Sequence, residues 1–163
     1  IALDSITPQD KGCQQRLIEL LAPLGFVCET IVSNGVTNLW ARKGTEAPVF
    51  VFAGHTDVVP TGPSDQWSSQ PFNAEVRDGV LYGRGAVDMK GGIAVMLHAL
   101  MAFEESASAS GLGYDVLINS DEETGSLSSS ALIAALAQGK YAALTYEPSA
   151  KTIQAHNMAQ GAP

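Results

Sequence analysis

The sequence predicts an α/β protein in which a mostly parallel sheet carries helices on both faces. A continuous apolar run at 48–53 is typical of a strand that is buried on both faces, and 114–119 is predicted to be another buried strand. Segments with apolar residues at helical spacing alternate with these strands, most clearly at 89–103 and 128–137. Because alternating strands and helices form parallel sheets, this order predicts the fold class. Ligands of such sheets bind beyond the carboxyl ends of the strands.

The first predicted elements are a helix and a hairpin. Thr7 is expected as the N-cap and Pro8 as the first residue of a helix that ends before Gly25. The pattern that follows predicts two strands, at 26–32 and 37–42, joined by an Asn-Gly turn. These strands precede the apolar run at 48–53.

The rest of the chain continues the alternation. A loop rich in Pro, Gly and Ser follows the apolar run at 48–53. Beyond this loop the pattern predicts, in order, a short strand at 80–82, a helix at 89–103, a strand at 114–119, a helix at 128–137 and a strand at 142–146. A length of 163 residues suffices for one domain with a hydrophobic core.

The composition excludes several classes of function. The net charge is −8 and the nine Lys and Arg are scattered, so we expect neither nucleic-acid binding nor a membrane-surface patch. No apolar run approaches the roughly 20 residues of a membrane span, and the N-terminus has no signal-peptide pattern. The first residue is not Met, so the natural start is open. Cys13 and Cys28 are expected to be reduced thiols, which predicts a cytoplasmic protein.

Five separated fragments contain metal-binding residue types, and the first four place them near the predicted ends of strands. They are Gly54-His55-Thr56-Asp57, the glycine-rich stretch 83–92 around Asp88, Ser120-Asp121-Glu122-Glu123, Tyr146-Glu147-Pro148-Ser149, and a lone His156. One imidazole with three or four carboxylates suits a pair of divalent first-row ions, zinc above all. The pattern therefore predicts a metallohydrolase.

Each fragment also has a purely structural interpretation. His55 and Asp57 fit a metal ligand and the carboxylate that orients it, or a loop histidine beside a turn-forming aspartate. Asp88 fits a metal ligand or the cap of the helix that follows it. Glu122 and Glu123 fit one ligand and one general base, or a solvated acidic turn. Glu147 leaves a similar choice, but the shared placement of these fragments at strand ends argues against every structural interpretation holding at once.

At these residues the chain resembles the dizinc family of aminoacylases, acetylornithine deacetylases, glutamate carboxypeptidases and succinyl-diaminopimelate desuccinylases. The resemblance covers about residues 7–149. The stretches at 11–14, 38–40, 52–62 and 81–85 resemble the desuccinylase branch. By contrast, the stretch at 119–126 resembles glutamate carboxypeptidases equally well. The resemblance implies a zinc-peptidase-like catalytic domain.

The resemblance implies a role for each fragment. His55 and Glu147 would bind one zinc ion, Glu123 the other, and Asp88 would bridge both. This gives two zinc ions per chain in the complete site, for which Co²⁺ can substitute. Asp57 would orient the imidazole.

The resemblance also implies a catalytic group and a missing ligand. Glu122 would be the general base. The second zinc ion of the family takes a further histidine near the C-terminus of a much longer chain. His156 faintly matches that segment, but it fits equally well the start of an inserted lid domain or an unrelated tail.

The implied reaction is hydrolysis of the amide bond of an N-acyl amino acid. In the desuccinylase branch the substrate is N-succinyl-LL-2,6-diaminopimelate, a small molecule of lysine and diaminopimelate biosynthesis. Glutamate carboxypeptidase or acetylornithine deacetylase activity are the alternatives, and a catalytically silent metal-binding fragment is the alternative of another class.

The length departs from that of the family. A complete member is well over twice as long and has a lid domain that supports dimerisation. We therefore expect a fragment without the lid, in which residues 1–149 belong to the zinc-dependent catalytic domain and 150–163 form an unassigned tail or truncated continuation. We expect a homodimer at full length and little or no activity of the fragment alone.

Overall fold

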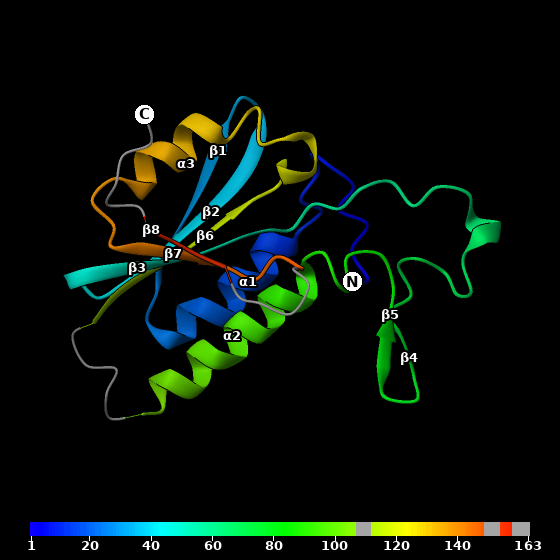
Figure 1. Ribbon diagram of the computed structural model, residues 1–163, viewed down its shortest axis with the longest axis horizontal. Helices are drawn as coiled ribbons and strands as arrows, with labels where there is room; N and C mark the ends of the chain where they lie inside the picture. The colour runs from blue at the N-terminus through cyan, green and yellow to red at the C-terminus, as the bar shows by residue number, and fades with distance from the viewer. Residues whose placement is uncertain (107–111, 149–153, 158–163) are drawn as a thin grey trace.

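A six-stranded mixed sheet lies at the centre of the computed structural model, between helices α1 and α2 on one face and α3 on the other (Figure 1). The structure describes residues 1–106, 112–148 and 154–157, the last four through their backbone only. The elements are α1 (Cys13–Leu21), β1 (Val27–Ser33), β2 (Val36–Lys43), β3 (Glu46–His55), β4 (Glu75–Arg77), β5 (Val80–Tyr82), α2 (Lys90–Glu104), β6 (Leu112–Asn119), α3 (Ser130–Ala137), β7 (Ala142–Thr145) and β8 (Gln154–Asn157).

The sheet is parallel at its centre and antiparallel at its margins. Its strand order is β1-β2-β6-β3-β7-β8, and β3 pairs in parallel with both β6 and β7. The hairpin β1–β2, its junction with β6, and the pairing of β7 with β8 are antiparallel. The predicted α/β class with helices on both faces is confirmed. The antiparallel strands come from the predicted hairpin and from β8, which the sequence pattern did not indicate.

Helix α1 begins later than the sequence pattern indicates, and the prediction that Thr7 caps it is wrong. The Thr7 N–H donates to the Val58 carbonyl (3.1 Å), which holds this segment against another part of the chain. The helix begins at Cys13. The carboxylate of Asp10 accepts a hydrogen bond from the N–H of Gln14 (2.9 Å) and so satisfies a free donor of the first turn.

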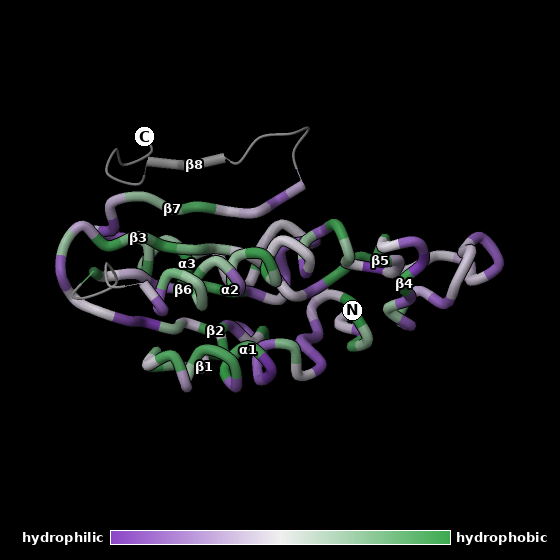
Figure 2. Tube along the Cα trace, turned by 90° about the horizontal axis from the view of Figure 1, so that it is seen from below, coloured by the Kyte–Doolittle hydropathy of each residue, from purple (hydrophilic) through white to green (hydrophobic). Residues whose placement is uncertain are grey.

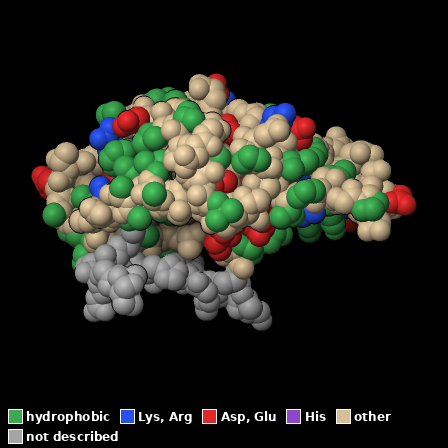
Figure 3. Space-filling model, turned by 90° about the horizontal axis from the view of Figure 1, so that it is seen from above, with side chains coloured by type: hydrophobic (Ala, Val, Ile, Leu, Met, Phe, Trp, Pro, Cys, Tyr) green, Lys and Arg blue, Asp and Glu red, His purple; other side chains and the backbone are tan. Residues whose placement is uncertain are grey.

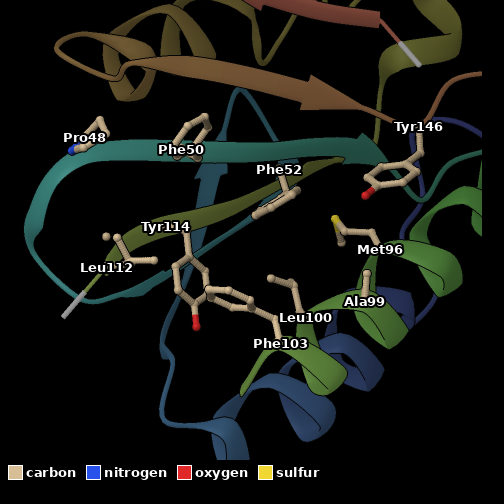
Figure 4. Close-up of a pocket in the computed structure, with 11 residues that line it drawn as sticks. Pro48, Phe50, Phe52, Met96, Ala99, Leu100, Phe103, Leu112, Tyr114 and Tyr146 are labelled. Atoms are coloured by element: carbon tan, nitrogen blue, oxygen red, sulfur yellow. The ribbon is translucent and has the colours of Figure 1, made fainter. Parts of the chain in front are cut away.

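The core lies between the sheet and helices α1 and α2. Hydrophobic residues concentrate along the central strands and α2 (Figure 2). The prediction that 48–53 is buried on both faces is wrong, because Phe50 is 42% exposed. Figure 4 shows the reason: Phe50 and Phe52 border an apolar cavity of about 420 Å³ beside α2, opposite Leu100 and Phe103.

An arm formed by residues 59–85 projects from the body and contains the β4–β5 hairpin (Figure 1). The predicted strand at 80–82 is confirmed, but it pairs with β4 in a separate two-stranded sheet. The arm leads back into the body shortly before α2. Among the described residues, no helix is both long and apolar enough to cross a lipid bilayer.

Candidate metal centre

The candidate site lies where three parallel strands end side by side. His55 closes β3 and lies opposite Asn119, the last residue of β6. Two residues earlier in β3, Ala53 lies opposite Thr145, the last residue of β7. The residues that follow these strands therefore meet at one edge of the sheet, as the topology predicts.

The imidazole of His55 is the centre of the cluster. It is fully buried, and its Nε2 atom lies 3.1 Å from Oδ1 of Asp88, 3.4 Å from Oε1 of Glu147 and 3.7 Å from Oε2 of Glu122. Its other nitrogen, Nδ1, lies 2.9 Å from the carbonyl oxygen of Asp57 and 3.3 Å from Oδ1 of the same residue. The Nε2 edge of the ring thus points at carboxylates that come from three separate segments.

A third glutamate, Glu123, belongs to a group that could hold a metal ion. Ligand atoms of His55, Asp88 and Glu123 all lie within 4.8 Å of one another. Imidazole nitrogen and carboxylate oxygen are zinc ligands at about 2.0–2.2 Å, so a small shift of these side chains would suffice for coordination. The three carboxylates around Nε2, those of Asp88, Glu122 and Glu147, remain 37–49% exposed. Figure 3 shows acidic side chains gathered at one place on the surface.

Asp57 connects the imidazole of His55 to the backbone of Glu122 and Glu123. Its carboxylate is fully buried and accepts hydrogen bonds from the backbone N–H of Glu122 (3.3 Å, at Oδ1) and of Glu123 (3.2 Å, at Oδ2). Burial on its own would raise the pKa of Asp57. The hydrogen bonds with His55, Thr7 and the backbone of Glu123, together with the charge of His55, outweigh burial, and the pKa is lowered. The sequence indicates a partnership of Asp57 with His55 alone, because no local pattern links Asp57 to backbone groups 65 residues away.

The electrostatics of the cluster favour a bound cation. Burial would lower the pKa of His55, but the hydrogen bond and charge of Asp57 and the charge of Glu147 raise it to about 9. Burial, opposed by His55 and reinforced by Asp88, raises the pKa of Glu147 to about 7. Burial and then Asp88 also raise the pKa of Glu123. Crowded carboxylates that retain protons indicate too little positive charge, so a divalent ion fits this donor set.

The structure brings together six of the seven residues that the sequence singled out, namely His55, Asp57, Asp88, Glu122, Glu123 and Glu147. The seventh, His156, lies in β8 and its backbone pairs with Ala143 of β7, two residues before that strand ends. The side chain of His156 lies outside the described part of the structure, so its role stays a prediction.

Two curated relatives named "Succinyl-diaminopimelate desuccinylase" are similar to this chain in sequence. The protein of Herminiimonas arsenicoxydans is 66% identical over 123 residues, which cover 76% of this chain and 33% of the relative. The protein of Bordetella avium (strain 197N) is 49% identical over 146 residues, which cover 90% of this chain and 39% of the relative. The chain thus spans between 33% and 39% of the length of these relatives.

The fold is similar to that of a solved metallopeptidase, the M20 family metallo-carboxypeptidase Sso-CP2 from Sulfolobus solfataricus. The TM-score is 0.78 at 22% identity, over 91% of this chain and 35% of the solved chain. Residues 51–160, more than half of the chain, match the family described as "Peptidase family M20/M25/M40". This range includes every residue of the candidate metal centre. The chain therefore belongs to peptidase family M20/M25/M40.

Proposed function

We propose that this chain is part of a zinc-dependent enzyme that hydrolyses the amide bond of N-succinyl-LL-2,6-diaminopimelate to succinate and LL-2,6-diaminopimelate. The convergence of the His55 imidazole with Asp88, Glu122 and Glu147 carries the proposal that the site performs metal-assisted hydrolysis. The substrate rests on similarity to relatives named succinyl-diaminopimelate desuccinylase. The reaction belongs to the biosynthesis of lysine and diaminopimelate.

In this proposal the cluster holds two zinc ions, for which Co²⁺ can substitute. His55 and Glu147 would hold one ion, Glu123 the other, and Asp88 would contact both. When bound, zinc supplies Lewis-acid chemistry, because it acidifies a water molecule and polarises an amide carbonyl. The distances of 3.1 and 3.4 Å from Nε2 of His55 to Asp88 and Glu147 support this ligand set.

Glu122 acts as the general base. Its carboxylate takes a proton from the attacking water while the new C–O bond forms at the amide carbon. The same carboxyl then gives that proton to the leaving nitrogen as the C–N bond breaks, so succinate and a free amine result. The side chain of Glu122 is 48% exposed, which leaves it accessible to a substrate. Its backbone is held through the hydrogen bond to Asp57, which also orients His55 from Nδ1.

The remaining parts of the proposal concern the whole protein. Residues 1–149 form the zinc-dependent catalytic part, and 150–163 form a tail or the start of a continuation. The full-length protein is a homodimer in the cytoplasm, and it binds neither nucleic acid nor membranes. Free thiols at Cys13 and Cys28 support a reducing compartment, and the net charge of −8 supports the absence of nucleic acid.

The test is a comparison of substrates with the full-length protein. We expect turnover of N-succinyl-LL-2,6-diaminopimelate to exceed that of N-acetylornithine and of a folate-type glutamate amide. A chelator should abolish this turnover and added zinc should restore it. Preference for another substrate would overturn the substrate assignment. Zinc bound at normal content with no turnover of any substrate would instead show a catalytically silent metal-binding protein.

A further inference from the structure

A network of buried polar side chains lies behind the candidate metal centre, and none of its members belongs to the centre itself. Gln14, Thr56 and Ser120 are between 0 and 2% exposed, although each carries a hydrogen-bonding group. Burial of such groups is costly unless they are bonded. The partners of these three side chains lie just before α1, in its first turn, in β2, and in the loops that follow β3 and β6.

The first branch of the network holds the loop after β3. Thr56 lies between His55 and Asp57, and its hydroxyl donates to Oδ1 of Asp10 (3.0 Å). The Asp10 carboxylate also accepts from the N–H of Gln14, in the first turn of α1. The beginning of α1 is therefore tied to the residue that separates the imidazole from its orienting carboxylate.

The second branch holds the loop after β6. The side-chain amide of Gln14 donates from Nε2 to the hydroxyl of Ser120 (2.7 Å) and to the Thr37 carbonyl (2.9 Å). The hydroxyl of Ser120 donates to the same Thr37 carbonyl (3.1 Å). Ser120 stands two residues before Glu122 in the acidic loop. Both branches thus meet at Gln14, through its backbone N–H for the first and its side chain for the second.

We infer that Gln14 is a positioning residue that sets the distance between loop 55–57 and loop 120–123, and so holds the ligands of both loops at the spacing that a metal ion requires. The inference rests on the proposed function, because it assumes that the cluster binds metal. Besides the bonds through Gln14, three sets of described hydrogen bonds join these loops. They are those of the Asp57 carboxylate, at 3.2 and 3.3 Å, the long bond between the hydroxyls of Thr56 and Ser120 (3.4 Å), and the bonds from the N–H and the hydroxyl of Thr56 to the Asn119 carbonyl. The inference also gives a role to the stretch at 11–14.

The experiment replaces Gln14 in the full-length protein and compares it with a control on the same helix. Gln14→Met keeps a similar volume but removes both amide donors. Leu17→Ala is the control, because Leu17 is buried in the core and its apolar side chain forms none of the hydrogen bonds of the network. Metal affinity by chelator competition, kcat, KM and Tm are measured for each. Loss of an outer-shell partner typically costs about 10–100-fold in metal affinity or activity.

We expect that loss for Gln14→Met, in metal affinity and kcat, with a much smaller change in KM. Leu17→Ala should lower Tm at least as much while its folded form binds metal like the parent. Thr56→Val, which removes the hydroxyl, should weaken metal binding, whereas Thr56→Ser, which keeps it, should not. If Gln14→Met does not fold, Ser120→Ala removes the same hydrogen bond with a smaller change and decides the question.

The outcomes separate this inference from the proposed function. If the parent protein binds no metal, the proposed function fails, and the inference fails with it. If the parent binds metal and both Gln14→Met and Ser120→Ala bind it equally tightly while lowering Tm, the network is only structural and the inference alone is overturned.

Discussion

Replacement of Asp57 by asparagine tests the geometry of the cluster most directly. The Asp57 carboxylate is fully buried and accepts the N–H groups of both Glu122 and Glu123. Asparagine has the same shape but offers one oxygen and one NH₂ group, so one of these two N–H groups must lose its acceptor. A hydrogen bond to a charged group contributes about 1.5–3 kcal/mol to stability. We expect Asp57→Asn to lower the free energy of unfolding by about this amount.

The assay is thermal unfolding of the full-length protein in a chelator, followed by a metal titration. For a domain of 150–250 residues, 1 kcal/mol corresponds to a Tm shift of about 2–4 °C, and the shift is smaller in a longer protein, so Tm should fall by at most about 12 °C. Metal affinity should fall by about 10–100-fold, because Asp57 orients His55. Asp65→Asn, which makes the same charge change on the exposed arm, is the matched control. Unchanged Tm and metal affinity in Asp57→Asn would refute the reasoning.

The pH dependence of this effect follows from the two pKa shifts. The pKa of Asp57 lies below its usual 3.8, so its contribution to stability is present above pH 3.8 and disappears as the pH falls through the folded value. The pKa of His55 is raised from 6.5 to about 9, so its contribution is complete below pH 6.5 and disappears as the pH rises through about 9. The difference between parent and Asp57→Asn should therefore be largest between pH 3.8 and 6.5 in the metal-free protein.

Three further predictions concern the ionisable side chains of the cluster. Glu122→Gln should reduce kcat by about 10²–10⁴-fold at normal zinc content, because a general base acts on water rather than on the ion; retained turnover would contradict its role. Glu123→Ala should instead lose metal, measured as zinc per chain after dialysis, and full zinc content would contradict its assignment as a ligand. In the metal-free protein His55 and Glu147 hold protons up to about pH 9 and about pH 7. Metal affinity should therefore rise with pH across this range, with proton release measurable by calorimetry in two buffers, and an affinity independent of pH would contradict it.

Local sequence patterns predict the elements of this fold well where the signal is itself local. The turn at Asn34 and Gly35 has positive φ angles at both residues, as an Asn-Gly hairpin requires. The apolar segments at 48–53 and 114–119 predict strands β3 and β6, and apolar residues at helical spacing predict helix α2. The start of α1 could not be predicted in the same way, because the hydrogen bond from Thr7 to Val58 depends on a partner 51 residues away.

In the candidate site, too, the sequence predicts which residues take part but not which distant groups they contact. The sequence identified the cluster because histidine and carboxylates follow the ends of strands, and the parallel register then brings those ends together. Nothing in the sequence indicated that Gln14 reaches Ser120, 106 residues away, or that Asp57 accepts backbone groups. A side chain whose function is to hold another segment has no local signature, since its identity matters only after the segments have met.

Repulsion within the cluster explains why such holding residues are needed. Asp88 and Glu147 lie within 3.4 Å of one imidazole nitrogen, and Glu122 lies only slightly farther. Without a cation these like charges favour separation of the loops that carry them. Burial is the main cause of the raised pKa of Glu147, and the charges of Asp88 and Glu122 add to it. The buried hydrogen bonds of Gln14 and Asp10 with these loops oppose this separation. A divalent ion would turn the repulsion into attraction, so a framework that holds the carboxylates together before the ion arrives reduces the ordering that metal binding must supply.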